Sequence, residues 1–283
     1  MQSIYYWLTA RELRGVGLKF FKKITLFELT YSHYWLLARE LRNIQHKFFS
    51  KLIDSIILPS VLVVINGYVL PHLGLPAEYG TFMLAGYAVL FSENTVYNCA
   101  TELVADLNGP QAIIYELTLP VSYRFIYAKI AFSYAFKSVI LNFWSIPISA
   151  LLLGDMFDWQ SVSVIKFFAM YIMINIFFAF IEIITALSFE SLEEFGSFWI
   201  RWGWVLYALG CATFPWSVLY QVTPVGAYLN LLNPYVYLFE GMRSTVMEPT
   251  GLSFGFCFTV ICLITIINAY VGMKWFKQRL DCI

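Results

Sequence analysis

"FFAMYIMINIFFAFIEIITALS", residues 167–188, contains a single charged side chain, Glu182. A helix of about 20 apolar residues crosses the hydrocarbon core of a bilayer, which is roughly 30 Å thick. The stretch therefore predicts a transmembrane helix. The composition of the chain agrees, because 60% of its residues are hydrophobic and only 13% are charged, about half the charged fraction of an average globular domain. We expect an all-α integral membrane protein.

Five further apolar segments predict membrane spans on either side of this one. In chain order, the six expected spans are 52–73, 82–103, 130–153, 167–188, 198–214 and 252–273. The fifth is shorter than the others and runs into Pro215. The sequence thus predicts two regions, a cytoplasmic region over 1–51 and a six-span transmembrane permease domain over 52–283.

Basic residues predict the orientation of these spans, since Lys and Arg are enriched on the cytoplasmic side. Four segments on one side, which together hold 13 Lys and Arg residues, are 1–51, 104–125, 189–199 and 274–283. The loops on the other side hold only Arg243. We therefore expect a multi-pass protein of the cytoplasmic (inner) membrane with both termini in the cytoplasm. The formal net charge of zero argues against nucleic acid as a partner.

A short basic segment occurs twice near the start of the chain. Residues 6–23 and 34–51 are identical at 12 of 18 positions. In each copy the apolar side chains recur at steps of three and four, which predicts an amphipathic helix. A basic helix with Trp and Phe on its apolar side is typical of a segment that lies in the lipid headgroup layer. Both copies are predicted to be interfacial helices, and the first is either a passive membrane anchor or an extra contact surface for a partner.

The chain lacks the motifs of a membrane enzyme. Its three histidines form no cluster, because His33 and His46 lie in the second basic segment and His72 lies at the outer end of the first span. No His-Glu-x-x-His, Gly-x-Ser-x-Gly, Cys-x-x-Cys or P-loop pattern occurs. We therefore expect no catalytic site, no metal site and no ATP hydrolysis through a P-loop of this chain. Energy for any driven work would have to come from another subunit.

Three charged residues fall inside predicted spans, namely Glu93, Lys137 and Glu182. Each charge costs about 2.5–3.5 kcal/mol at the middle of a membrane, so these side chains should face the protein interior. One interpretation is that Lys137 pairs with Glu93 or Glu182 and fixes the packing of the helices. The other is a polar patch on a substrate path or a proton relay.

The segment between the second and third predicted spans reads "ELVADLNGPQAIIYELTLPVSYRFIYAKI", residues 102–130. Its Asn108-Gly109-Pro110 sequence predicts a turn, followed by a short amphipathic helix over about 111–119 and a break at Pro120. A short rigid helix exposed to the cytosol suits contact with a partner.

The segment after the fifth predicted span, residues 214–251, is apolar but is divided by three prolines at 215, 224 and 234. The pieces are too short to cross a bilayer and are predicted to dip back into the outer leaflet as a re-entrant segment. Within it, Glu240 and Arg243 are spaced to form an ion pair on one helix face.

Together these two segments resemble the permease subunits of type-2 ATP-binding-cassette exporters, over residues 30–280. In that family the coupling segment after the second span contains an acidic residue, a Gly-Thr pair and leucine before Pro-Val-Ser. The matching residues are Asp106, Gly109, Leu117, Leu119, Pro120, Val121 and Ser122, followed by Lys129. The family's second mark, Leu-Asn-Pro with aromatics and Glu-x-x-Arg, corresponds to Leu232, Asn233, Pro234, Tyr235, Tyr237, Glu240 and Arg243. The chain departs from the pattern where Gly109-Pro110 replaces Gly-Thr.

The resemblance implies a transmembrane subunit that moves a lipid, glycan or hydrophobic molecule out of the cytoplasm or inner leaflet. The implied partners are ABC ATPase (nucleotide-binding) subunits, a second permease copy, more readily a homodimer than a heterodimer, and membrane lipid. ATP and Mg would be bound by the ATPase, and this chain would bind no cofactor itself.

The resemblance also implies roles for particular residues. The expected ATPase-coupling residues are Asn108, Gly109, Tyr115, Glu116, Leu117 and Pro120, with Arg39 and Arg42 from the second interfacial helix. The expected outer-gate residues are Asn233, Pro234, Glu240 and Arg243. The structural alternatives are a solvated loop for the first set, and a helix cap with a local ion pair for the second. The functional alternatives are an ATP-independent secondary transporter or channel, and a membrane scaffold subunit.

Overall fold

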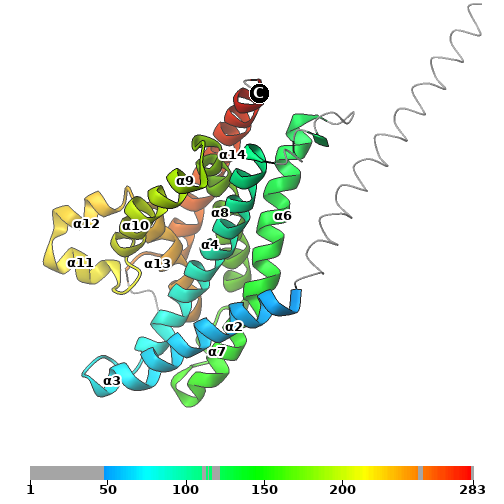
Figure 1. Ribbon diagram of the computed structural model, residues 1–283. Coiled ribbons are helices and arrows are strands. Elements are labelled where there is room, and N and C mark those ends of the chain that lie inside the picture. Colours follow the sequence, from blue (N-terminus) through cyan, green and yellow to red (C-terminus); the bar gives the residue numbers. More distant parts are fainter. Residues whose placement is uncertain (1–47, 110–112, 114, 117–121, 248–250, 282–283) are drawn as a thin grey trace, which may run out of the picture.

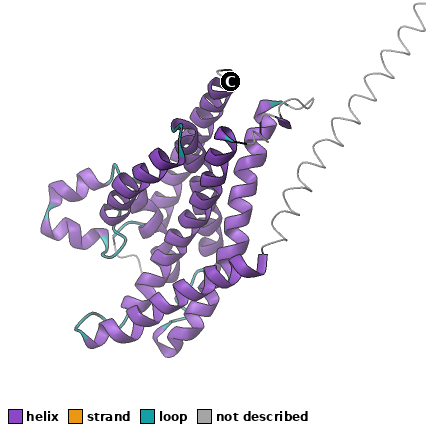
Figure 2. Cartoon of the chain, in the orientation of Figure 1, coloured by secondary structure: helices purple, strands orange, loops and turns teal. Residues whose placement is uncertain are grey.

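The computed structural model describes residues 48–109, 113, 115, 116, 122–247 and 251–281. This part of the chain consists of helices and their connections, without any strand (Figure 2). The predicted all-α class is thereby confirmed. Most of the expected cytoplasmic region 1–51, including Arg39 and Arg42, lies outside the described residues.

Five long helices form the body of the described structure (Figure 1). They are α2 (Phe48–Val64), α4 (Tyr79–Asn108), α6 (Tyr123–Phe143), α8 (Val164–Ser188) and α14 (Phe254–Asp281). Shorter helical elements extend or connect them: the π-helical turn η1 (Ile65–Val69), α3 (Leu70–His72), α7 (Ser145–Leu153), the 3-10 turn η2 (Gly154–Met156), α9 (Leu192–Phe198), the π-helical turn η3 (Trp199–Gly203), α10 (Trp204–Leu209), α11 (Trp216–Val222), α12 (Pro224–Asn230) and α13 (Pro234–Val246).

Four stretches of the described chain are helical, long and apolar enough to cross a membrane. They are Phe48–His72, Tyr123–Met156, Val164–Ser188 and Phe254–Arg279, and they correspond to the predicted spans one, three, four and six. Soluble proteins bury such stretches or lack them, whereas here the first and last are largely exposed. The chain is therefore a multi-pass membrane protein.

The predicted second span lies within α4, which is long enough to cross a bilayer but more polar than those four stretches. It packs against α2, α6, α8 and α13 and occupies the centre of the body (Figure 1). Of its 30 residues, 19 are buried. Neighbouring helices therefore cover most of α4, which explains how it can carry polar side chains without exposing all of them to lipid.

The predicted fifth span is replaced by a helix that runs from Leu192 to Leu209 with a π-helical turn in its middle. It ends at Gly210, and the following residue, Cys211, has a positive φ of 66°. A turn with left-handed backbone at Cys211 therefore ends the helix before Phe214, the last residue expected in this span. The crossing of the membrane by this helix and by α4 stays a prediction.

The three prolines after this helix divide the chain as predicted. Pro215 is the residue that precedes α11, whereas Pro224 and Pro234 are the first residues of α12 and α13. Proline is favoured at these positions because the first N–H groups of a helix need no partner within it. Helices α11 and α12 project from the body (Figure 1), while nearly all of α13 is buried. The re-entrant course through the outer leaflet stays a prediction.

The end of the first span meets the start of α4 through two glycines. A Cβ atom built on Gly80 would lie 2.7 Å from the Cα of Gly67 and 2.8 Å from Leu153 Cδ2 of α7. Such small-residue contacts let membrane helices approach closely and gain van der Waals packing. The crossing therefore fixes where α2 and α7 join the body.

This close approach predicts that Gly80→Ala destabilises the fold. The added methyl has no room, and overpacking typically costs about 1–3 kcal/mol. The midpoint of thermal unfolding in detergent should fall. The control is Gly255→Ala in α14, where nothing lies within 4 Å of the added carbon; alanine there should leave the midpoint unchanged or raise it, because it favours helix by about 1 kcal/mol. Equal midpoints for the two variants would contradict the prediction.

Candidate functional site

The segment between α4 and α6 is attached to both helices by side-chain contacts. Near the end of α4, Asp106 Oδ2 accepts a hydrogen bond of 3.0 Å from the backbone N–H of Ile113. At the start of α6, Lys129 Nζ donates to Glu116 Oε2 at 2.5 Å, and both side chains are only 3% exposed. We call these two contacts the α4–α6 clamp. The clamp couples the position of the connecting segment to both helices.

The buried ion pair of this clamp fixes geometry more than it adds net stability. Taking two charges out of water costs free energy that their attraction roughly repays, but removing one partner costs about 3–5 kcal/mol because the other charge stays buried. The Lys129–Glu116 pair therefore resists separation of the segment from α6.

The predicted coupling residues differ in their exposure. Glu116 is buried in its pair with Lys129, so the expected direct contact of Glu116 with an ATPase does not fit this arrangement. Tyr115 beside it is 66% exposed, and its contact with an ATPase stays a prediction. Asn108 and Gly109 are exposed at the end of α4. Leu117 and Pro120, like Arg39 and Arg42, lie outside the described residues.

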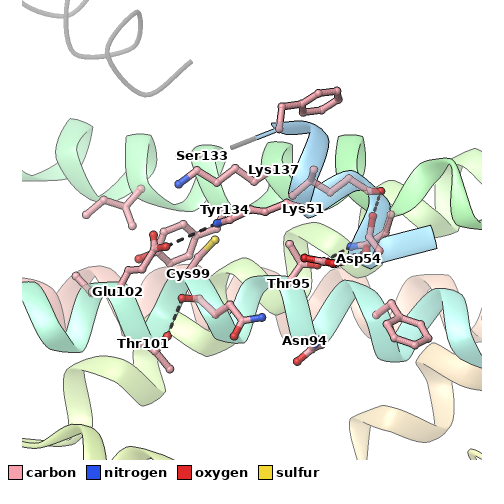
Figure 3. Close-up of a pocket in the computed structure, with 18 of the residues that line it drawn as sticks. Lys51, Asp54, Asn94, Thr95, Cys99, Thr101, Glu102, Ser133, Tyr134 and Lys137 are labelled. Carbon is pink, nitrogen blue, oxygen red and sulfur yellow. Dashed lines mark hydrogen bonds and ion pairs between the residues drawn. The ribbon is translucent and has the colours of Figure 1, made fainter. Parts of the chain in front are cut away.

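A polar groove lies between α2, α4 and α6, with a volume of about 1050 Å³ (Figure 3). The charged side chains that line it are Lys51, Asp54, Glu102, Asp106, Glu116, Lys129 and Lys137. The uncharged polar side chains that line it are Ser55, Asn94, Thr95, Asn98, Thr101, Ser133, Tyr134 and Asn142. The groove thus collects most of the polar side chains that these three helices carry.

Hydrogen bonds join the three helices that form the groove. Ser55 Oγ donates to the carbonyl of Leu141 at 2.7 Å, which joins α2 to α6. Close by in the sequence of α6, Asn142 Nδ2 donates to Thr95 Oγ1 at 2.9 Å, which joins α6 to α4. Nearer the start of α2, Lys51 Nζ lies 3.8 Å from Glu102 Oε1, and the two side chains are 47% and 65% exposed. Two hydrogen bonds therefore fix the three helices near Ser55 and Asn142, whereas near Lys51 only a partly exposed ion pair links α2 to α4.

The expected pairing of Lys137 with an intramembrane acid is wrong for the part of the chain that the structure describes. Glu93 is buried and accepts a hydrogen bond from the hydroxyl of Tyr235 on α13. Glu182 is buried and accepts one from Thr185 on its own helix, at 3.2 Å. Lys137 instead lines the groove. The two acids therefore lie in the buried interior of the helix bundle, whereas Lys137 lies in the groove.

The predicted Glu240–Arg243 ion pair is confirmed, at 3.4 Å, and it is part of a larger buried network. Arg243 also donates to the backbone carbonyls of Cys211 and Ala212, and the ring of Phe82 in α4 covers its guanidinium at 3.6 Å. Arg243 has no exposed surface. The network joins α13, the turn after α10 and α4, which is a structural role; a gating role stays a prediction.

The other two residues of the expected outer gate form the start of α13. Asn233 Oδ1 accepts from the backbone N–H of Tyr235 at 3.0 Å, and its Nδ2 donates to the carbonyl of Leu206 at 2.7 Å. Pro234 is the first residue of the helix. The Asn-Pro pair thus caps α13 and ties it to α10, as the helix-cap alternative predicted.

Sequence reasoning missed the clamp and the groove. No sequence pattern indicated the Lys129–Glu116 pair, because its residues are 13 positions apart with a break at Pro120 between them, so no helix spacing relates them. The groove had such a pattern: Asn94, Asn98 and Glu102 recur every four residues in an otherwise apolar stretch, which marks one polar helix face.

Comparison of the chain with models of known protein families, with curated proteins and with solved structures found no match. Among the described residues, no group of His, Cys, Asp or Glu is arranged to hold a metal ion.

The Arg243 network predicts a strong stability effect. Arg243→Met leaves the carboxylate of Glu240 buried without its cation and should cost about 3–5 kcal/mol of unfolding free energy, seen as a lower thermal midpoint in detergent. The double variant with Glu240→Leu should recover part of this loss. Arg201→Met is the control, since Arg201 is exposed. A double variant no more stable than Arg243→Met would show that the carbonyl and ring contacts, not the ion pair, dominate.

Proposed function

We propose that this chain is the transmembrane subunit of an ATP-driven exporter, with ATP bound and hydrolysed by separate ABC ATPase subunits. The observation that supports this best is the α4–α6 clamp, which ties residues 113 and 116 of the connecting segment to two long helices. A second support is the resemblance to type-2 exporter permeases, in which a Pro-Val-Ser segment and an Asn-Pro…Glu-x-x-Arg segment follow one another in the same order as here.

A clamp of this kind is what transmission of force requires. ATP can drive a conformational change only if its binding favours one permease conformation over another. The connecting segment must then move together with the helices. Because Asp106 holds it to α4 and Glu116 holds it to α6, displacement of the segment displaces both helices.

The proposal places six spans in the cytoplasmic membrane, with both termini and the α4–α6 connection on the cytoplasmic side. Two copies of the chain would enclose the translocation path, and a lipid, glycan or hydrophobic molecule would leave through it. The helices α11–α13 would form the outer, re-entrant part of each copy. Glu240 and Arg243 would hold that part in shape.

Substitution of Tyr115, the exposed aromatic residue of the connecting segment, tests the proposal. The chain is purified from membranes that also contain ABC ATPase subunits encoded by neighbouring genes, and co-purifying vanadate-sensitive ATPase activity is measured. Tyr115→Ala should lower this activity about tenfold or more, since a buried aromatic at an interface typically contributes at least 2 kcal/mol.

The control is Leu192→Ala, because Leu192 is also an exposed apolar residue and begins α9, in the next segment on the proposed cytoplasmic side. This variant should retain the ATPase. A folded wild-type chain without any ATPase in such membranes would contradict the proposal.

A second candidate, an ATP-independent proton-coupled carrier, is favoured by the two buried carboxyl groups. In the described part of the chain, Glu93 Oε2 and Glu182 Oε1 have no hydrogen-bond partner, so each group has room for a proton. Under this alternative, Glu182→Gln would abolish the dependence of transport on a proton gradient. An ATP-driven exporter would show no such dependence in wild type, and the substitution would leave the energy source unchanged.

A further inference from the structure

Helix α4 shows one exposed face, and that face is polar. Its exposed residues are Asn94, Asn98, Glu102, Ala105 and Asn108. They follow one another at steps of three and four, so they form a single stripe along the helix. The first three line the groove between α2, α4 and α6.

Such a stripe cannot face lipid tails at low cost. Amide and carboxylate groups without hydrogen-bond partners cost several kcal/mol each in hydrocarbon. In a membrane protein the groove must therefore hold water or a polar group. Its volume of about 1050 Å³ is at the upper end of typical ligand sites, which span about 300–1,000 Å³.

The charges in the groove favour an anion at one particular place. Of the three lysines that line it, Lys129 is held by Glu116 and Lys51 lies near Glu102. Lys137 is half-buried and has no ion-pair partner among the residues that the structure describes. Figure 3 shows Lys51 and Lys137 directed into the space over the stripe of α4. A phosphate group there would gain a charge-assisted hydrogen bond from Lys137.

The acids in the groove limit how much negative charge the ligand can carry. Asp54 and Glu102 line the same space and would repel a multiply charged anion. They accept hydrogen bonds from hydroxyl groups, as do the side-chain carbonyls of Asn94 and Asn98. A phosphodiester with one negative charge and neighbouring hydroxyls fits both sets of groups.

The surroundings of the groove suit acyl chains. Leu58 of α2 lines it and is about half exposed, and Phe48 lines it at the start of the same helix. On α6, the exposed ring of Phe132 stacks on Phe136. Apolar side chains therefore lie beside the polar interior, as an amphiphile requires.

We infer that the groove between α2, α4 and α6 binds the phosphodiester headgroup of a membrane lipid, with the phosphate at Lys137 and hydroxyls along Asn94 and Asn98. As the loading site of a transported lipid, this groove rests on the proposed exporter function. As a lipid-binding site, it does not, because binding needs neither ATP nor an ATPase.

The test uses the purified chain without ATPase, in neutral detergent, and phosphatidylglycerol as the probe, with bound lipid counted by native mass spectrometry. Lys137→Gln should weaken binding about tenfold or more, because the hydrogen bond lost is to a charged group. Lys137→Arg should retain binding. The matched control, Lys274→Gln in α14, removes an exposed lysine outside the groove and should bind as wild type does.

A second variant guards against misfolding of the first. Asn98→Asp changes an exposed residue and adds a negative charge to the groove, so it should lower affinity while the thermal midpoint stays near that of wild type. Folded Lys137→Gln and Asn98→Asp variants that bind as wild type does would overturn the inference.

Two competitors identify the part of the lipid that is recognised. Dioleoylglycerol, which has acyl chains without a headgroup, should not compete, and equal competition by it would overturn headgroup recognition. Glycerophosphoglycerol, the headgroup without acyl chains, should compete more weakly than phosphatidylglycerol does. Equal competition by it would reassign the groove to a soluble phosphodiester and overturn the lipid assignment.

Discussion

The enclosure of the Arg243 guanidinium is the constraint on which the packing of α13 and the turn after α10 against α4 depends. A guanidinium stays charged in proteins and carries five N–H donors, so it can be buried only where acceptors surround it. Here Glu240 supplies one acceptor from the same helix, and the turn after α10 supplies two backbone carbonyls. The ring of Phe82 closes one face. Helix α13, the turn and α4 must therefore meet at this point.

The features that sequence could predict are those set by local chemistry. The breaks at the three prolines follow from the missing N–H of proline, and the contact of Glu240 with Arg243 follows from their spacing on one helix. The long apolar helices follow from composition. Sequence could not predict that Lys137 lines the groove instead of pairing with Glu93 or Glu182, because position along a helix gives depth in the membrane but not which neighbouring helix the side chain faces. For the same reason the Lys129–Glu116 pair was unforeseen.

Helix α4 connects the functional features that the structure brings together. It provides one wall of the polar groove, it carries Asp106 of the α4–α6 clamp, and Phe82 near its start covers Arg243. A shift of the connecting segment would therefore reach both the groove and the α13 network through one rigid element. In the proposed exporter mechanism, this single helix would carry motion of the connecting segment to the groove and to α13. The rest of the proposal is based on the resemblance of two short segments.

The polar stripe of α4 also has a consequence for how the chain enters the membrane during synthesis. A helix that carries two asparagines and two glutamates within its central turns partitions poorly into lipid when it emerges alone. Most of its stripe lines the polar groove that forms only when α2 and α6 stand beside it, and these long helices precede and follow it in the chain. Insertion of α4 is therefore expected to be cooperative with its two neighbours. The unit of biogenesis would be a three-helix group, with the polar groove present from the moment of its assembly.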